Sequence, residues 1–266
     1  MENGNAFKNK KILVTVKAYP NPSKNYLETV CIAGITEEGQ WIRLYPIAYR
    51  HMPYDRWFKK YQWIEVAVKP YEKDFRIDSY RPDERSIRLG KWLPPGNWKE
   101  RKQVVLPTAS QSLEEIVKRY QEKRVSLGIF KPKEMYDFKI TKDEGDWGPQ
   151  QKRIMTQLRL FGDQPKPLQK IPWKFTYTFK CNDRSCKGHN LSIRDWEIFM
   201  LYKHLLEKDK YAIDEIMTKI RDGWLDKMWG ADKDSYLIVG SVFPRPSFVV
   251  LGVFWPPKTS GNQRQK

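Results

Sequence analysis

The residues best suited to chemistry lie close together in the C-terminal half of the chain. Cys181, Cys186 and His189 are separated by four and two residues and directly follow a strand-like segment. Zinc takes about four thiolate, imidazole or carboxylate ligands in a tetrahedron, and a compact loop can supply most of them. His204 is the expected fourth ligand, and Asp195 is an oxygen alternative. The spacing predicts a zinc site; the alternative is a polar turn with both cysteines packed beneath a sheet.

A nearby pair of carboxylates, Asp195 and Glu197, raises the question of a metal-dependent nuclease. If Ser192 caps the following helix, Asp195 is its third residue and acts in capping. Residues two apart on a helix point about 200° away from each other, so these two acids are not expected to share an ion. Glu197 and His204 lie on one face and form the catalytic pair of the alternative interpretation, a nuclease. Capping and salt bridging are the expectation that we prefer.

Basic residues interleaved with aromatic ones dominate the N-terminal half. Trp41, Arg43 and Tyr45 alternate with apolar residues and therefore share one face of a strand. Such a row can stack bases and contact phosphates, although for any single ring a place in the barrel core is the favoured interpretation. Further candidate nucleic-acid-binding residues are Arg50, Arg56, Lys59, Lys60, Arg76, Arg81 and Arg88.

The overall charge supports a polyanionic partner. Lys and Arg number 49 against 32 acidic residues, a net charge of +17, and both halves of the chain share the excess. No apolar run is long enough to span a membrane, and no basic amphipathic helix or secretory signal stands out. Three cysteines are too few for a disulfide framework, which favours the cytoplasm, and Cys31 is expected in the core.

The pattern of elements that must position these residues predicts an α+β fold. Short strands separated by turn signals are expected at 11–17, 28–35, 40–47, 63–68, 75–80 and 86–89, a rhythm typical of a small β-barrel. Ser112 opens a helix to about Arg124, and a strand is expected within 126–140. A helix over 150–161, a linker over 162–172, a strand over 173–181, helices over 192–208 and 211–228, and a closing hairpin over 236–254 complete the expectation. The predicted organisation is a barrel region at 10–142, a connecting segment at 143–172 and an α+β domain at 173–258.

Residues 29–35, followed by Gly39-Gln40-Trp41-Ile42-Arg43-Leu44, resemble the opening of the dual OB-type domains of prokaryotic conflict systems. Residues 126–132 are similar to the closing strand of that domain. The resemblance implies two small barrels in tandem, nucleic-acid binding, with Trp41 and Arg43 as binding positions, and a role in anti-phage defence. We therefore expect a cytoplasmic protein that binds DNA or RNA, with a protein partner in a multi-component system as a further expectation. A basic adaptor for an acidic protein is the remaining alternative.

Overall fold

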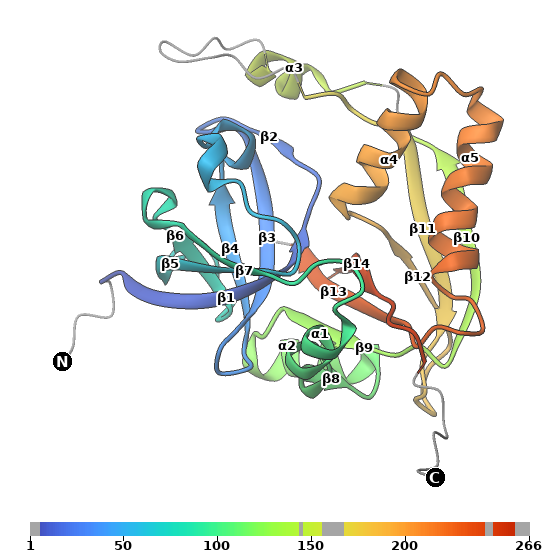
Figure 1. Ribbon diagram of the computed structural model, residues 1–266, viewed down its shortest axis with the longest axis horizontal. Coiled ribbons are helices and arrows are strands. Elements are labelled where there is room, and N and C mark those ends of the chain that lie inside the picture. The colour runs from blue at the N-terminus through green and yellow to red at the C-terminus, as the bar shows by residue number, and fades with distance from the viewer. Residues whose placement is uncertain (1–5, 144–145, 156–167, 243–246, 259–266) are drawn as a thin grey trace.

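The computed structural model describes residues 6–143, 146–155, 168–242 and 247–258. It has a mixed α+β architecture, as the sequence predicts. Figure 1 shows the barrel strands on one side and helices α4 and α5 with their sheet on the other. The hairpin of β13 and β14 runs between them.

A closed five-stranded barrel forms the N-terminal part. Its strands are paired in the order β1, β3, β4, β6 and β5, and β5 pairs back with β1 to close the ring. All of these pairs are antiparallel except β4 with β6. This arrangement is compatible with an OB-like fold. The seven strands of this part are β1 (Lys8–Lys17), β2 (Asn21–Ser23), β3 (Leu27–Thr36), β4 (Trp41–Ile47), β5 (Gln62–Pro70), β6 (Ser79–Pro82) and β7 (Arg88–Trp92), with 3-10 turns at Tyr49–His51, Tyr54–Arg56 and Glu84–Ser86.

Alternating apolar side chains fill the barrel. Along β5, Ile64, Val66 and Val68 are buried, while Glu65 between them is exposed, as expected for a strand with one face toward a core. Where β1 and β3 cross, Gly34 is needed for space, because a Cβ there would lie 2.5 Å from the carbonyl oxygen of Leu13. Most barrel strands were therefore predictable from the sequence pattern. The strand expected at 75–80 begins only at Ser79, and the one expected at 86–89 begins at Arg88, after a 3-10 turn.

The rest of the chain builds two further sheets. One has the order β10, β11, β12 and the other β14, β13, β9, β8. Helices α4 and α5 pack on the first sheet through a core that includes Phe138, Phe175, Tyr177 and Ile216. The elements are α1 (Trp98–Val105), η4 (Leu106–Thr108), β8 (Ala109–Ser110), α2 (Leu113–Lys123), β9 (Leu127–Phe130), β10 (Glu134–Lys142), α3 (Pro149–Met155), β11 (Trp173–Lys180), β12 (His189–Ser192), α4 (Trp196–Glu207), α5 (Ile213–Arg221), a π-helical turn at Asp222–Lys227, β13 (Tyr236–Val242) and β14 (Ser247–Phe254).

The segment expected to close the barrel pairs elsewhere. Strand β9 lies beside β13 and β8, and β10 lies beside β11. Residues 127–130 are all buried, and a short apolar run of this kind does not specify its partner strand. Helix α1 was not expected, and α4 begins at Trp196 with Asp195 as its N-cap, not at Ser192. The expected helical residues 156–161 and linker residues 162–167 lie outside the described part of the chain.

Candidate metal centre and barrel cleft

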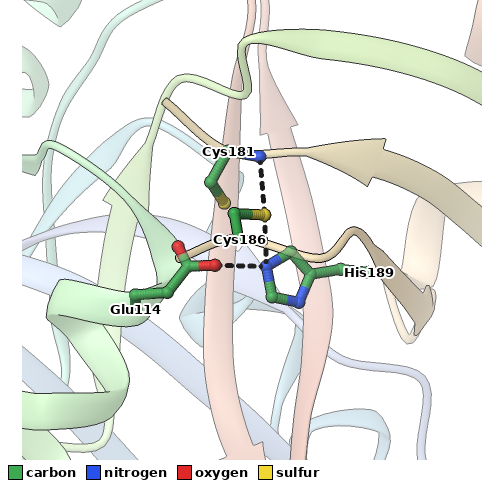
Figure 2. A group of neighbouring side chains, drawn as sticks. All are labelled: Glu114, Cys181, Cys186 and His189. Carbon is green, nitrogen blue, oxygen red and sulfur yellow. Dashed lines mark hydrogen bonds and ion pairs between the residues drawn. The ribbon is translucent and has the colours of Figure 1, made fainter. Parts of the chain in front are cut away.

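Four side chains that could hold a metal ion converge at the corner between α2, β11 and β12. Cys181 directly follows β11, Cys186 lies in the turn, His189 begins β12, and Glu114 comes from the first turn of α2. Their ligand atoms all lie within 4.8 Å of one another. Figure 2 shows the four side chains pointing toward a common centre.

The turn between β11 and β12 is shaped by local hydrogen bonds. The Asp183 carboxylate accepts from the backbone N–H of Ser185 at 2.8 Å and from its hydroxyl at 2.6 Å. Gly188 has φ +93°, a conformation that favours glycine. The N–H of Cys181 donates to Cys186 Sγ at 3.2 Å, and the N–H of Leu113 donates to Cys181 Sγ at 3.4 Å. These donors would stabilise thiolates at both sulfurs.

The spacing of the ligand atoms suits a small ion. Cys186 Sγ lies 3.3 Å from His189 Nε2, which lies 2.8 Å from Glu114 Oε1. Metal–ligand bonds of about 2.3 Å to sulfur and about 2.0–2.1 Å to nitrogen would place tetrahedral S and N atoms roughly 3.5 Å apart. Glu114 Oε2 is buried and has no hydrogen-bond partner among the described residues. An orphaned carboxylate oxygen beside two thiols and an imidazole is what a missing cation would leave.

The pKa values of the Glu114 carboxyl group and the Cys181 thiol are shifted in opposite directions. Burial raises the pKa of Glu114, but hydrogen bonds to its carboxylate from its own backbone, Cys186 and His189 outweigh this and hold the pKa at about 2. Burial raises the pKa of the Cys181 thiol. Glu114 is therefore a ready anionic ligand, whereas Cys181 would release its proton when a metal binds.

Sequence reasoning found three members of this cluster and missed the fourth. His204 lies on α4, is more than half exposed, and has its Nε2 3.7 Å from Asp209 Oδ1. Glu114 occupies the fourth position instead. In the sequence, Glu114 belongs to the capping pattern that begins at Ser112, and nothing local links it to residues 181–189. Only the packing of α2 against the end of β11 brings it there.

The two carboxylates of the nuclease interpretation meet, contrary to expectation. Because Asp195 is the N-cap and not the third helical residue, its side chain and that of Glu197 turn toward the same lysine. Lys60 Nζ lies 2.9 Å from Asp195 Oδ2 and 2.9 Å from Glu197 Oε2. The ammonium group thus occupies the position between the carboxylates where a cation would sit. Asp195 is fully buried, and burial raises its pKa to about 6.

Glu197 and His204 do not form a pair. Seven helical residues correspond to about 10 Å along the axis, too far for one ion. Glu197 contacts Lys60, and His204 contacts Asp209. The catalytic pair predicted for the nuclease is therefore not assembled by α4.

A cavity of about 630 Å³, which we call the barrel cleft, opens beside the barrel. Its barrel wall consists of the β1–β2 connection, residues in the middle of β3 and β4, and the β5–β6 connection. Its other wall comes from the second part of the chain. The lining includes the basic and aromatic residues Arg43, Tyr45, Tyr71, Lys73, Arg76, Trp147, Lys170, Trp173 and Arg194.

Three of the predicted nucleic-acid-binding residues line this cleft. Arg43 is 4% exposed; it donates to Cys31 Sγ at 2.9 Å and to Ser126 Oγ at 3.0 Å. Its Nε has no partner among the described residues, and none of their carboxylates lies within 4.0 Å of its guanidinium. Arg76 is held by Asp74 at 2.6 Å and by the carbonyl of Ser241 at 2.8 Å. The positive charge at Arg43 therefore lacks a direct counterion.

The aromatic rings of the cleft come from both walls. Tyr45 and Tyr71 form an edge-to-face pair with centroids 6.0 Å apart. Trp147 and Trp173 are half-buried on the opposite wall. Tyr71, Trp147 and Trp173 were not singled out as binding residues from the sequence, because they are far from residues 41–45 in the chain.

The other predicted binding residues are dispersed. Trp41 is 9% exposed and belongs to a core cluster. Its ring packs against core residues and is therefore not available to stack on a base. Arg50 pairs with Glu28 at 3.0 Å. Lys60 is bound to the two carboxylates described above, and Arg56 is half-buried. Exposed positions outside the cleft are Lys59, Arg81 and Arg88.

Across the described residues, every helix is too short or too polar to cross a lipid bilayer.

A search of curated proteins finds no match to the chain. Two family models match in adjacent stretches: "Domain of unknown function (DUF8758)" matches residues 8–107, and "Domain of unknown function (DUF8757)" matches residues 109–266. The division between them falls where the chain leaves the barrel and enters α2 and the second group of sheets. Because the second match spans more than half of the sequence, the protein belongs to the family described as Domain of unknown function (DUF8757).

Proposed function

We propose that this protein binds single-stranded nucleic acid, DNA or RNA, in the barrel cleft. The observation that carries the proposal is a cavity of about 630 Å³ in which both walls carry basic side chains and aromatic rings. A cavity of this size accepts unpaired bases but not a base-paired duplex.

The position of the cleft on the barrel supports this proposal. OB-type barrels bind oligonucleotides on the face of their second and third strands and through the two connections beside it. Here the second and third barrel strands are β3 and β4, which contribute Cys31, Arg43 and Tyr45. The β1–β2 and β5–β6 connections complete that wall.

The charge of the barrel cleft also supports nucleic-acid binding there. Five cations line the cavity, namely Arg43, Lys73, Arg76, Lys170 and Arg194, against Asp74 and Asp143. Asp74 is engaged by Arg76 through several hydrogen bonds, so this pair contributes little net charge to the cleft. The remaining four cations are opposed by Asp143 in the lining. Phosphates would meet the cations, and bases would stack on the tyrosine and tryptophan rings.

We further propose that the cluster of Glu114, Cys181, Cys186 and His189 holds zinc in a structural role. Two sulfurs, one nitrogen and one oxygen are a ligand set that zinc accepts, and four protein ligands leave no open position for substrate. Zinc would fasten the start of α2 to the β11–β12 turn and so fix the part of the chain that supports the cleft. A role in prokaryotic defence rests on the resemblance of residues 29–44 alone, and neither family description names such a system.

The nucleic-acid proposal is tested with charge-matched variants. Arg194→Ala and Arg88→Ala each remove one exposed arginine, the first from the cleft and the second from β7. Affinity for a fluorescent poly-dT or poly-U oligonucleotide is measured by anisotropy over a series of salt concentrations. We expect Arg194→Ala to weaken binding and to reduce the slope of log affinity against log salt by about 0.7, as for one lost phosphate contact. Arg88→Ala should change neither.

Equal effects of the two variants would contradict the cleft as the binding site. Binding to heparin without binding to oligonucleotides would instead favour an acidic protein partner. Cleavage of the oligonucleotide in magnesium that is lost in Glu197→Ala would favour the nuclease.

A further inference from the structure

A second cavity, of about 600 Å³, lies at the other end of the interface between the barrel and the C-terminal strands. We call it the basic cavity. It is bounded by the end of β1, the residues just before β5, the end of β7, α1, and the end of β14 with the residues that follow it. None of its lining residues lines the barrel cleft, so the two sites can be tested separately.

Cations in the basic cavity lie against aromatic rings. Lys59 Nζ is 4.2 Å from the centroid of Trp92, and the Arg101 guanidinium is 4.0 Å from the centroid of Tyr61. Lys17 Nζ is 4.9 Å from the centroid of Tyr49. Cation–π contacts of this kind orient the positive groups without neutralising them.

Carboxylates are scarce around these cations. Among the residues that the structure describes, no carboxylate oxygen lies within 4.0 Å of the charged nitrogens of Lys17, Lys59 or Arg101. Glu197 is the one acid in the cavity lining, and Lys60 already holds its carboxylate at 2.9 Å. The cavity lining is therefore net positive, and the one carboxylate in the described lining, Glu197, contacts Lys60 while acting on Lys17 and Arg101 only from a distance.

Lys17 is the most constrained of the three. Its ammonium group donates to the Tyr49 hydroxyl and the Phe58 carbonyl, both at 3.4 Å. Lys60, Asp195 and Glu197 are the charged groups nearby. Burial is the main cause that lowers the pKa of Lys17, to about 8, and the positive charge of Lys60 adds to this. Glu197 and Asp195 oppose this shift without coming within 4.0 Å of Lys17 Nζ, and a bound anion would further stabilise the buried charge.

We propose that the basic cavity binds a phosphate-bearing ligand of nucleotide size. Lys17, Lys59 and Arg101, which no carboxylate of the described residues contacts directly, would contact the phosphate. Trp92, which is 37% exposed, offers an aromatic surface for a planar base. The volume exceeds that of a phosphate ion alone and lies in the range of small-molecule sites. The same chemistry is offered by a free nucleotide and by the phosphorylated end of a nucleic-acid strand.

The proposal is tested by titration calorimetry of the full chain with AMP, adenosine and inorganic phosphate at pH 7. AMP should bind, and adenosine should bind at least about tenfold more weakly because it lacks the charged acceptor. Lys59→Ala and Lys17→Met should each weaken AMP binding by about tenfold. Lys99→Ala is the matched control: Lys99 is exposed on α1 beside Arg101 but does not line the cavity.

Each outcome decides for or against the proposal. Absence of AMP binding, or equal losses in Lys59→Ala and Lys99→Ala, would overturn it; should Lys17→Met fail to fold, Lys59→Ala still decides. Arg194→Ala in the barrel cleft should leave AMP binding unchanged, which separates this site from the proposed nucleic-acid site. A 5′-phosphorylated oligonucleotide that displaces AMP better than its 5′-hydroxyl form would identify a strand end as the source of the phosphate, and equal displacement would favour a free nucleotide.

Discussion

Replacing Cys186 with serine, or removing zinc with a chelator, should lower the thermal stability of the protein without unfolding it at room temperature. Cys186 is 6% exposed and contributes one of four ligand atoms that lie within 4.8 Å of one another. The segments that carry the ligands also pack through Leu113, Ile116 and Phe179, so the corner has apolar contacts that do not depend on metal.

The expected size follows from linkage. A metal present at 1,000 times its dissociation constant stabilises the folded state by about 4 kcal/mol. At about 2–4 °C per kcal/mol for a chain of this size, loss of the metal should lower Tm by roughly 8–16 °C. The same loss is expected in Cys186→Ser, whose Tm should then respond little to a chelator.

The assay is differential scanning fluorimetry with and without a chelator, together with elemental analysis of the purified protein. Glu114→Gln should weaken zinc retention, whereas Glu122→Gln, an exposed change on the same helix, should not. His204→Ala should keep one zinc per chain. A wild-type Tm that is insensitive to chelation, with no metal in the protein, would refute the reasoning; zinc lost in His204→Ala would refute the choice of Glu114.

Three further predictions concern the lysines and the glycine around Asp195. Lys60→Met should lower the free energy of unfolding in urea by about 3–5 kcal/mol, because it leaves Asp195 fully buried without its partner. The adjacent Lys59→Met should be nearly neutral, and similar losses in both variants would contradict the prediction. Gly252→Ala should cost about 1–3 kcal/mol, since a Cβ there would lie 3.2 Å from Asp195 Oδ2; an unchanged denaturation midpoint would show that the pair can move aside. Between pH 8 and 10.5 the unfolded chain holds the Lys17 proton more tightly than the folded chain, so this group makes the free energy of unfolding rise with pH. The rise should reach up to about 3 kcal/mol relative to Lys17→Met. Parallel curves of stability against pH for the two proteins would disprove it.

Most strands of the barrel were predictable because their signals, short apolar runs bounded by turn residues, are local. In β5, Ile64, Val66 and Val68 alternate with less buried residues, whereas β4 is buried at nearly every position. The partner of residues 127–130 was not predictable, because a short run with every residue buried looks the same in any sheet. The conclusion that the chain contains a small barrel is confirmed, whereas the assignment of this segment to it is not.

The candidate metal site was likewise predictable where its signal is local and not where it depends on tertiary packing. Three ligands close in sequence were predicted together, but Glu114 reaches them only through the tertiary packing of α2. Trp41 and Arg43 share a strand with Tyr45, yet the two are buried in the structure, because β9, the residue before it and the C-terminal hairpin pack against them. A sequence pattern identifies which residues share a face but not what covers the face.

Photo-crosslinking of a bound oligonucleotide, followed by mass spectrometry of the digested protein, tests the central claim most directly. If single-stranded nucleic acid occupies the barrel cleft, crosslinks should concentrate on peptides that contain Tyr45, Tyr71 and Trp173, and they should decrease in Arg194→Ala. Crosslinks confined to the exposed outer strand β7, or spread evenly over basic peptides, would contradict it.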